Sequence, residues 1–340
     1  YFKSFFKTEW PISKECVQQN PPAFGFRFPV NRRVPDFFQI DLEKRLFRKA
    51  YLSLIRLGWK PDLIHAQSGM DASIYANHIS DQTGIPFVII EHQVFVFHYY
   101  SKQRSTLIMD AFKAAKRTAA VSYDERRQVM MNQPACHPEV ICNLVDEENY
   151  FIDQSKRNKE FTVVTILNSN PIKGATEFLD AIKIVIKVDP NVKFIMIGRG
   201  ADEKSRVQSE NLFIRKSKEL GIFDNGEFFL FVAREEIPNL LNRAHVFVSP
   251  SIQEPFGIAA REAMMCGLPV ISTKNGGVED AIISNSGILT QVGLPSDLAN
   301  AIIQIKEIIN KYDPQEIRSH CIIECGKEKF LKSMTEFYEI

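Results

Sequence analysis

The chain has 340 residues, 45% of them hydrophobic and 24% charged, a composition typical of a globular protein with two domains of ordinary size. The formal net charge of +1 gives no bulk electrostatic support for nucleic-acid binding. Six cysteines lack the paired spacing of a metal site and the density of a disulfide scaffold, so we expect reduced thiols and a cytoplasmic location. No apolar run has the length of a transmembrane helix, and we recognise no signal peptide at the start.

The opening segment, residues 1–37, is aromatic and basic and has no helical period. Five prolines interrupt it, so we predict strands and turns. Phe2 and Phe5 alternate with lysines, which fits either contact with a membrane surface or a half-buried strand. The alternation favours the strand.

The remainder of the first half alternates between helical and strand-like patterns. Apolar residues recur at helical spacing between Asp41 and Leu57, which predicts a helix with Asp41 as its N-cap. His92 closes the second of the strands that follow. We predict strands at 61–66, 85–90 and 118–122, helices at 71–83 and from Asp124, a loop and helix within 94–117, a strand and turn at 139–146, and a polar linker at 147–160.

An apolar strand at 161–167 opens the second half of the chain. In the turn that follows it, Lys173 stands beside a glycine and can reach phosphate oxygens with its ammonium group. Gly198 ends the next strand and would allow a ligand to approach the backbone closely. The other predicted elements are helices ending at Val188, over 205–220, from Arg234, from a Ser296 cap to Tyr312 and over 316–340, and strands at 192–198, 228–232 and 287–290.

The stretch 246–283, VFVSPSIQEPFGIAAREAMMCGLPVISTKNGGVEDAII, carries the clearest pattern in the chain. It predicts a strand, a glycine loop, a helix and a second strand, with a further helix after Asn275-Gly276-Gly277. The helix start would leave free the backbone N–H groups of three residues, which together make a site for an anion such as phosphate. These residues are Phe256, Gly257 and Ile258.

Two carboxylates, Glu254 and Glu262, flank that anion site on the loop and the helix. Acids beside a phosphate would repel it, so we predict that both accept hydrogen bonds from hydroxyl groups. An anion site between two hydroxyl acceptors matches a nucleotide sugar, with the diphosphate in the middle, the ribose at one end and a hexose at the other.

The motif PSxxEPFGxxxxEAMxxGLPVI over 250–271 resembles the retaining glycosyltransferases of the GT-B fold, family 4, with their E-x7-E pattern. The resemblance implies an α/β fold of two Rossmann-like, doubly wound domains that face a central cleft. It implies transfer of a hexose-type sugar from a UDP- or GDP-sugar to a saccharide or lipid-linked acceptor, with no cofactor and no metal. A lipid-linked acceptor would allow peripheral contact with the inner face of a membrane.

The family pattern assigns roles to matching positions of this chain. Glu254 would bind donor-sugar hydroxyls, Glu262 the ribose and Lys173 the diphosphate, while His92 would face the sugar from the first domain. The predicted catalytic residues are Glu254, His92 and Lys173, and the predicted donor-binding residues are Asn168, Lys173, Gly198, Glu254, Phe256, Gly257, Ile258 and Glu262. We assign no covalent nucleophile, and the sequence contains no D-x-D metal motif.

The chain departs from the family pattern in two places. Asn168 stands where the family has an arginine, so one charge for the diphosphate is missing. No strand with a glycine-rich loop precedes residue 40, so we expect a first domain that is truncated or reduced. We predict this domain at 1–146, a linker at 147–160, the donor domain at 161–325 and a helix crossing back to the first domain at 326–340.

Two other interpretations compete with an active transferase. The first is a catalytically impaired protein that binds nucleotide sugars, which Asn168 favours. The second is another GT-B enzyme, such as an epimerase or a phosphorylase. The E-x7-E pattern argues against the epimerase, and we locate no lysine for a phosphorylase cofactor.

Overall fold

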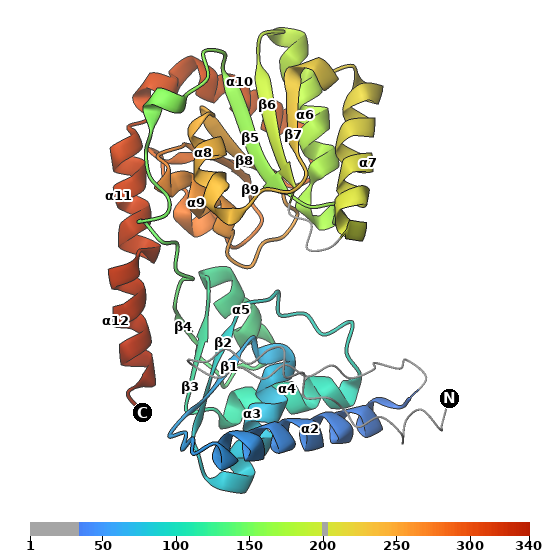
Figure 1. Cartoon of the computed structure of the whole chain (residues 1–340), viewed down its shortest axis with the longest axis vertical. Helices are drawn as coiled ribbons and strands as arrows, with labels where there is room; N and C mark the ends of the chain where they lie inside the picture. The colour runs from blue at the N-terminus through green and yellow to red at the C-terminus, as the bar shows by residue number, and fades with distance from the viewer. Residues whose placement is uncertain (1–33, 199–202) are drawn as a thin grey trace. The chain divides into compact units, whose positions relative to one another are not determined.

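The computed structural model describes residues 34–198 and 203–340 (Figure 1). The strands and turns predicted before residue 34, and residues 199–202, lie outside this range. The chain divides into two compact units. One holds the described residues up to Ile89 together with Val96–Lys116, and the other holds Ile90–Phe95 and Arg117–Ile340. The domain boundaries predicted from the sequence stay a prediction.

Helices and strands alternate along the described residues, as the sequence predicts. The strands are β1 Ile64–Gln67, β2 Phe87–Glu91, β3 Arg117–Ala120, β4 Glu139–Val140, β5 Thr162–Leu167, β6 Lys193–Gly198, β7 Gly226–Phe229, β8 Val246–Ser249, β9 Val270–Thr273 and β10 Gly287–Thr290. The α-helices are α2 Asp36–Arg56, α3 Gly69–Thr83, α4 Lys102–Ala114, α5 Tyr123–Asn132, α6 Ala175–Val188, α7 Glu203–Leu220, α8 Ile237–Asn242, α9 Ile258–Met265, α10 Pro295–Ile308, α11 Pro314–Cys325 and α12 Lys327–Tyr338. Short 3₁₀ helices are η2 Gln154–Lys156, η3 Pro171–Lys173, η4 Phe223–Asn225, η5 Arg234–Glu236, η6 Glu279–Ala281 and η7 Ile309–Lys311.

The strands form two sheets. The first has the order β1-β2-β3-β4, and β3 pairs with β4 in parallel. The second has the order β10-β9-β8-β5-β6-β7, and every neighbouring pair in it is parallel. This confirms the predicted fold class. From β5 the chain proceeds to one edge through β6 and β7, then returns to β8 on the other side, so the strand order reverses between β5 and β8.

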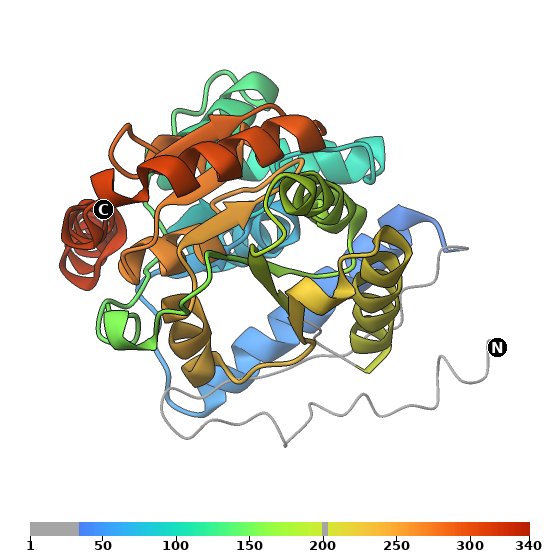
Figure 2. The same cartoon turned by 90° about the horizontal axis from the view of Figure 1, so that it is seen from above.

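Helices cover both faces of the second sheet, and its central strands are buried throughout. The six residues of β5 are all buried, as are those of β8 and β9. On one side of the sheet, α6 and α10 pack against each other. The core there includes Phe178 and Ile182 of α6 and Ile302 of α10. The helices α11 and α12 stack end to end along the second unit, where Figure 2 shows them down their axis.

Four local predictions are wrong, each for a physical reason. The first helix begins at Asp36, because Pro35 sets its start, so Asp41 is not an N-cap. Leu294, not Ser296, precedes α10, whose first residue is a proline. The predicted helix over 316–340 is two helices, since the backbone of Gly326 is extended.

The fourth error concerns the segment after Gly277, where we predicted a helix. Only η6 forms there. The N–H of Gly277 donates to the carbonyl of Glu254, and the carboxylate of Glu279 accepts from the N–H of Gly276. These bonds hold the segment against the preceding loop in a shape that a regular helix could not adopt.

Candidate functional site

The candidate site lies at the carboxyl ends of β5 and β8, where the strand order of the second sheet reverses. Open parallel sheets bind ligands at such a switch point. The turn after β5 carries Lys173, and the loop after β8 carries Glu254. The two central strands therefore position both side chains.

The loop after β8 is fixed by the loop that follows β9. The N–H of Glu254 donates to the carbonyl of Asn275 at 3.0 Å, and the N–H of Gly277 donates back to the carbonyl of Glu254 at 2.8 Å. A Cβ on Gly277 would lie 2.3 Å from the carbonyl carbon of Pro255, so only glycine permits this approach. Gly257 has a φ of +78°, a conformation that glycine adopts without strain, and it sets the direction of α9.

The first backbone amides of α9 remain available for a ligand. Within the described chain, the N–H groups of Phe256, Gly257 and Ile258 donate no hydrogen bond. The carbonyl of Phe256, by contrast, accepts a hydrogen bond from Nη1 of Arg261. The same Nη1 donates to the carbonyl of Gly277 at 3.0 Å. Arg261 is only 1% exposed, and its guanidinium carbon lies 3.8 Å from the centroid of the Phe256 ring. A buried cation thus holds the loop, and the free amides favour an anion.

Lys173 and Glu254 form an ion pair, with Nζ 2.7 Å from Oε1. The hydroxyl of Ser251 donates to the same carboxylate oxygen at 2.9 Å. The side chains of Lys173 and Glu254 are 28% and 16% exposed, so the pair is accessible from solvent. Gly174, with φ +72°, ends the turn, and a Cβ there would lie 2.1 Å from the carbonyl oxygen of Pro250. This close packing brings the two predicted residues together.

Glu262 is fully buried on α9 and lies against the hydroxyl of Tyr150. Burial raises the pKa of Tyr150, and the negative charge of Glu262 raises it further, while Arg234 lowers it. Interaction with Tyr150 is the main cause that raises the pKa of Arg234. Three residues from separate segments therefore form a cluster around the predicted ribose acceptor.

The segment that carries Tyr150 is held in place from α11 and α8. Arg318 donates to the carbonyls of Tyr150 and Met265, and to that of Glu147 at 2.7 Å. The side-chain amide of Asn242 donates to the carbonyl of Phe151 at 2.8 Å. The predicted linker is thus an anchored part of the site.

Asn168 and Gly198 lie at the ends of the adjacent strands β5 and β6. The side-chain oxygen of Asn168 accepts from the N–H of Asn170 at 3.0 Å, which shapes the turn leading to Lys173. A Cβ on Gly198 would lie 2.8 Å from the carbonyl oxygen of Leu230. The backbone of Leu230, and not a ligand, therefore makes the close approach that is observed at Gly198.

His92 follows β2, and its position is set by the preceding residue. One carboxylate oxygen of Glu91 accepts from the N–H groups of His92 at 2.9 Å and Gln93 at 2.8 Å. Burial lowers the pKa of His92, with the side chain of Asn143 acting in the opposite direction, so the imidazole is neutral at neutral pH. In the part of the chain that the structure describes, no hydrogen bond joins His92 to Glu254 or Lys173.

A second buried acid lies near Glu91. Glu125, on α5, is 0% exposed, and its pKa is raised to about 9 by burial and then by the charges of Glu91 and Asp124, while the N–H of Phe95 acts against the shift. Glu125 is therefore a neutral carboxylic acid at pH 7.

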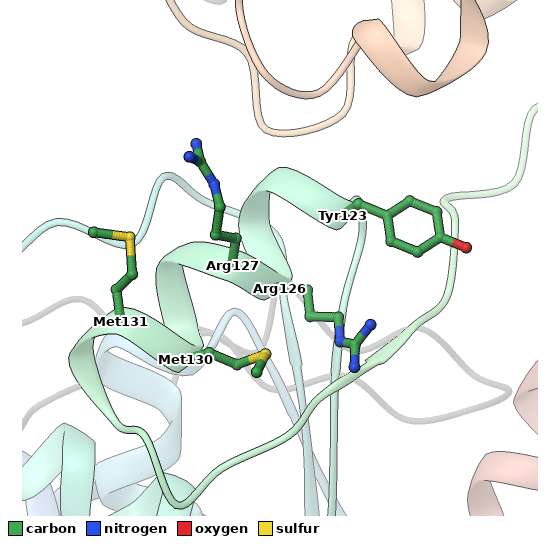
Figure 3. A pocket seen from close by; sticks show the side chains of 5 residues that line it. All are labelled: Tyr123, Arg126, Arg127, Met130 and Met131. Atoms are coloured by element: carbon green, nitrogen blue, oxygen red, sulfur yellow. The ribbon is translucent and has the colours of Figure 1, made fainter.

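A cavity of about 400 Å³ lies on α5, and none of the residues that line it is predicted for the site. Figure 3 shows the side chains that line it, with Arg126 and Arg127 pointing in different directions. Its lining residues are Tyr123, Arg126, Arg127, Met130 and Met131. Arg127 pairs with Asp124 on the same helix.

The described residues contain no group of histidine, cysteine or acidic side chains that could hold a metal ion. None of the helices in the described ranges is long and apolar enough to cross a membrane.

Sequence reasoning missed Arg261, Tyr150 and Arg234 as parts of the site. Arg261 carries a usable signal, because it lies three and four positions before Met264 and Met265, on the buried face of α9. Tyr150 and Arg234 carry none, since their contact with Glu262 depends on the tertiary fold.

Comparison with known proteins agrees with this geometry. The two parallel sheets, with a loop-bounded switch point in the second, have the architecture of the GT-B fold. A model described as Glycosyl transferases group 1 matches residues 146–316, and one described as Glycosyltransferase Family 4 matches residues 15–149. The chain belongs to the group 1 glycosyltransferases.

Among curated relatives, one subunit of the human phosphatidylinositol N-acetylglucosaminyltransferase is 26% identical over 252 residues, 72% of this chain and 50% of the relative. The gpi3 subunit of the same enzyme from Schizosaccharomyces pombe is 29% identical over 194 residues, 56% of this chain and 40% of the relative. The chain therefore spans half or less of the length of these relatives.

Two solved structures illustrate the shared fold. Sucrose-phosphate synthase from Thermosynechococcus elongatus superimposes with a TM-score of 0.78 at 18% identity, covering 95% of this chain and 84% of that one. Anabaena HepE in complex with UDP gives a TM-score of 0.75 at 22% identity, covering 86% and 81%. At these identities the likeness concerns the fold alone.

Proposed function

We propose that this chain is a retaining, metal-independent glycosyltransferase that moves a hexose-type sugar from a nucleoside-diphosphate sugar to a saccharide or lipid-linked acceptor. The observation that carries the proposal is the Lys173–Glu254 pair, 2.7 Å apart, beside the free amides at the start of α9. A cation, a carboxylate and an anion site in one place match the three parts of such a donor. The bound UDP of HepE supports a uridine nucleotide as the first donor to test.

In this mechanism Lys173 and the three amides bind the diphosphate. They stabilise the negative charge that develops on the leaving group, which is usually the largest electrostatic contribution to catalysis. An arriving phosphate competes for the ammonium group of Lys173, so the carboxylate of Glu254 becomes free to accept from sugar hydroxyls. One ion pair thus keeps both groups in place before the donor binds.

Glu262 accepts from the ribose hydroxyls, and Tyr150 and Arg234 orient its carboxylate. His92, neutral and at the end of β2, contacts the donor sugar as a hydrogen-bonding group and not as a cation. Asn168 contributes a neutral donor at the diphosphate. The human relative, whose name gives phosphatidylinositol as the acceptor, supports a lipid-linked acceptor for this chain.

Calorimetric titration with UDP and GDP tests the donor site. We expect saturable binding of one nucleotide, with an affinity about 10- to 100-fold lower in Lys173→Met, since charge-assisted hydrogen bonds contribute about 1.5–3 kcal/mol. Lys187→Met, an exposed change near the end of the helix that follows Lys173, is the matched control and should bind like wild type. Absence of binding to both nucleotides would refute the proposal.

A catalytically impaired binding protein is the second candidate, favoured by Asn168 in place of a charged residue. Incubation with the sugar nucleotides of the base that binds separates the two. Release of the nucleoside diphosphate, with or without an acceptor, indicates the enzyme. Saturable binding without any turnover of those sugar nucleotides would assign the chain to the second class.

A further inference from the structure

The long helix α2 lies along one side of the first unit, with α3 and α4 packed against it (Figure 1). Its inner face is fixed by buried contacts. Arg104 of α4 donates to Asp36 at 2.9 Å and to Glu43 at 3.0 Å, both on α2. The rings of Phe47 and Tyr75 stack with centroids 4.1 Å apart. These contacts prevent α2 from rotating about its axis, so they also determine which side chains face outward.

The outward side carries large apolar residues that the described fold leaves exposed. Phe38 is 59% exposed and Leu57 is 63% exposed, and they lie near opposite ends of the helix. The six exposed apolar side chains are Phe37, Phe38, Leu52, Ile55, Leu57 and Trp59. Single exposed apolar residues are ordinary, but a set gathered at the two ends of one helix needs an explanation.

Basic side chains are interspersed on the same side. Residues 36–60 hold six basic and three acidic residues in a chain whose net charge is +1. Two of the three acids are bound to Arg104, and Asp41 pairs with Arg45 at 2.7 Å. Within the described ranges, the other exposed cations enter no ion pair, and these are Arg48, Lys49, Arg56 and Lys60. We call the six apolar residues and these four cations the α2 outer face.

We propose that the α2 outer face docks on the surface of an anionic lipid bilayer. A helix of 21 residues presents a straight line of roughly 30 Å, which suits a planar surface. A bilayer offers anionic head groups and an apolar layer in the same plane, and this matches the mixture of cations and exposed aromatic and aliphatic side chains. A folded acidic protein would satisfy the cations but not six exposed apolar side chains, two at the start of α2 and four in its last turns and directly after it. The proposal does not depend on the transfer reaction.

Binding of the full chain to vesicles tests this directly. We expect cosedimentation with vesicles of phosphatidylcholine containing 30% phosphatidylglycerol, much weaker binding to pure phosphatidylcholine, and loss of binding in high salt. Replacing three of the cations in R48Q/K49Q/R56Q should weaken binding on the order of 100-fold, at about five-fold for each charge. The matched control K187Q/K329Q/K332Q removes three exposed lysines from α6 and α12 and should bind like wild type.

Trp59 provides an independent readout of position. The chain has two tryptophans, so in a Trp10→Phe background all tryptophan fluorescence comes from Trp59. Its emission should shift to shorter wavelength with the anionic vesicles, and Leu57→Ser should reduce binding without changing the charge.

Three results would overturn the proposal. They are absence of binding to the anionic vesicles, an equal loss in the control variant, and cosedimentation with no shift of Trp59. Self-association of the chain without lipid that R48Q/K49Q/R56Q abolishes would instead assign the face to a second copy.

Discussion

Two ion-pair sites of this protein contrast sharply. Arg104 is 8% exposed at its side chain and bonds to Asp36, Glu43 and Asp71, with Tyr75 close by. Burial alone would lower the pKa of Arg104, but its hydrogen bonds to Asp36, Asp71 and Tyr75 raise it well above the usual value. The guanidinium therefore has little capacity left for a ligand.

Lys173 is arranged in the opposite way. It has one carboxylate partner, Glu254, and both side chains remain partly exposed. An ammonium group has three donors, so Lys173 keeps donors for a ligand. The comparison teaches that a saturated, buried cation serves the fold, whereas a partly exposed cation next to free amides is suited to exchange partners.

The largest expected effect is on the buried network. Arg104→Met leaves acids buried without their cation, so the free energy of unfolding in urea should fall by about 3–5 kcal/mol. Arg104→Lys should recover part of the lost free energy of unfolding, because lysine keeps the positive charge but lacks the planar guanidinium that bonds several acids at once. Arg215→Met, which breaks an exposed pair with Glu219, should cost less than about 0.5 kcal/mol.

Lys173→Met sharpens the contrast from the other side. It should change the free energy of unfolding by less than about 1 kcal/mol, because a partly exposed ion pair contributes little to stability. The same substitution should weaken nucleotide binding. A large loss of stability in Lys173→Met, or a small one in Arg104→Met, would contradict the division between structural and ligand-binding cations.

Glu125 extends the comparison to an acid buried without a cation. Its pKa rises from 4.5 to about 9 on folding, so between these values the folded state binds more protons than the unfolded state. Stability is therefore lost as the pH rises from about 5 to 9, by at most about 1.4 kcal/mol per pH unit. Glu125→Gln resembles the protonated acid, so its stability advantage over wild type should grow with pH across this range.

Thermal unfolding from pH 5 to pH 9 measures that advantage. Glu160→Gln, at an exposed position, should show no change relative to wild type over the same range. An advantage of Glu125→Gln that stays constant with pH would mean that Glu125 does not titrate in this window.

Much of the fold and part of the site could be predicted because their signals are local. The strand, loop and helix around Glu254 follow from an apolar run, a glycine and a set of helix formers. The reversal of strand order brings Lys173 to Glu254, and a parallel αβ pattern implies such a meeting at the sheet's carboxyl edge. The irregular path after Gly277 could not be predicted, since backbone bonds to a loop more than 20 residues earlier decide it.

Tyr150 offers the smallest and most specific test, because no local signal identifies it. Its hydroxyl lies against Glu262, and Arg234 remains beside that carboxylate when the hydroxyl is removed. Tyr150→Phe should therefore lower nucleotide affinity by about five-fold, equivalent to about 1 kcal/mol, because Glu262 loses the buried polar hydroxyl beside its carboxylate. Tyr123→Phe, at an exposed tyrosine, should leave it unchanged. Calorimetry on both variants checks this, and unchanged affinity in Tyr150→Phe would show that Arg234 alone orients Glu262.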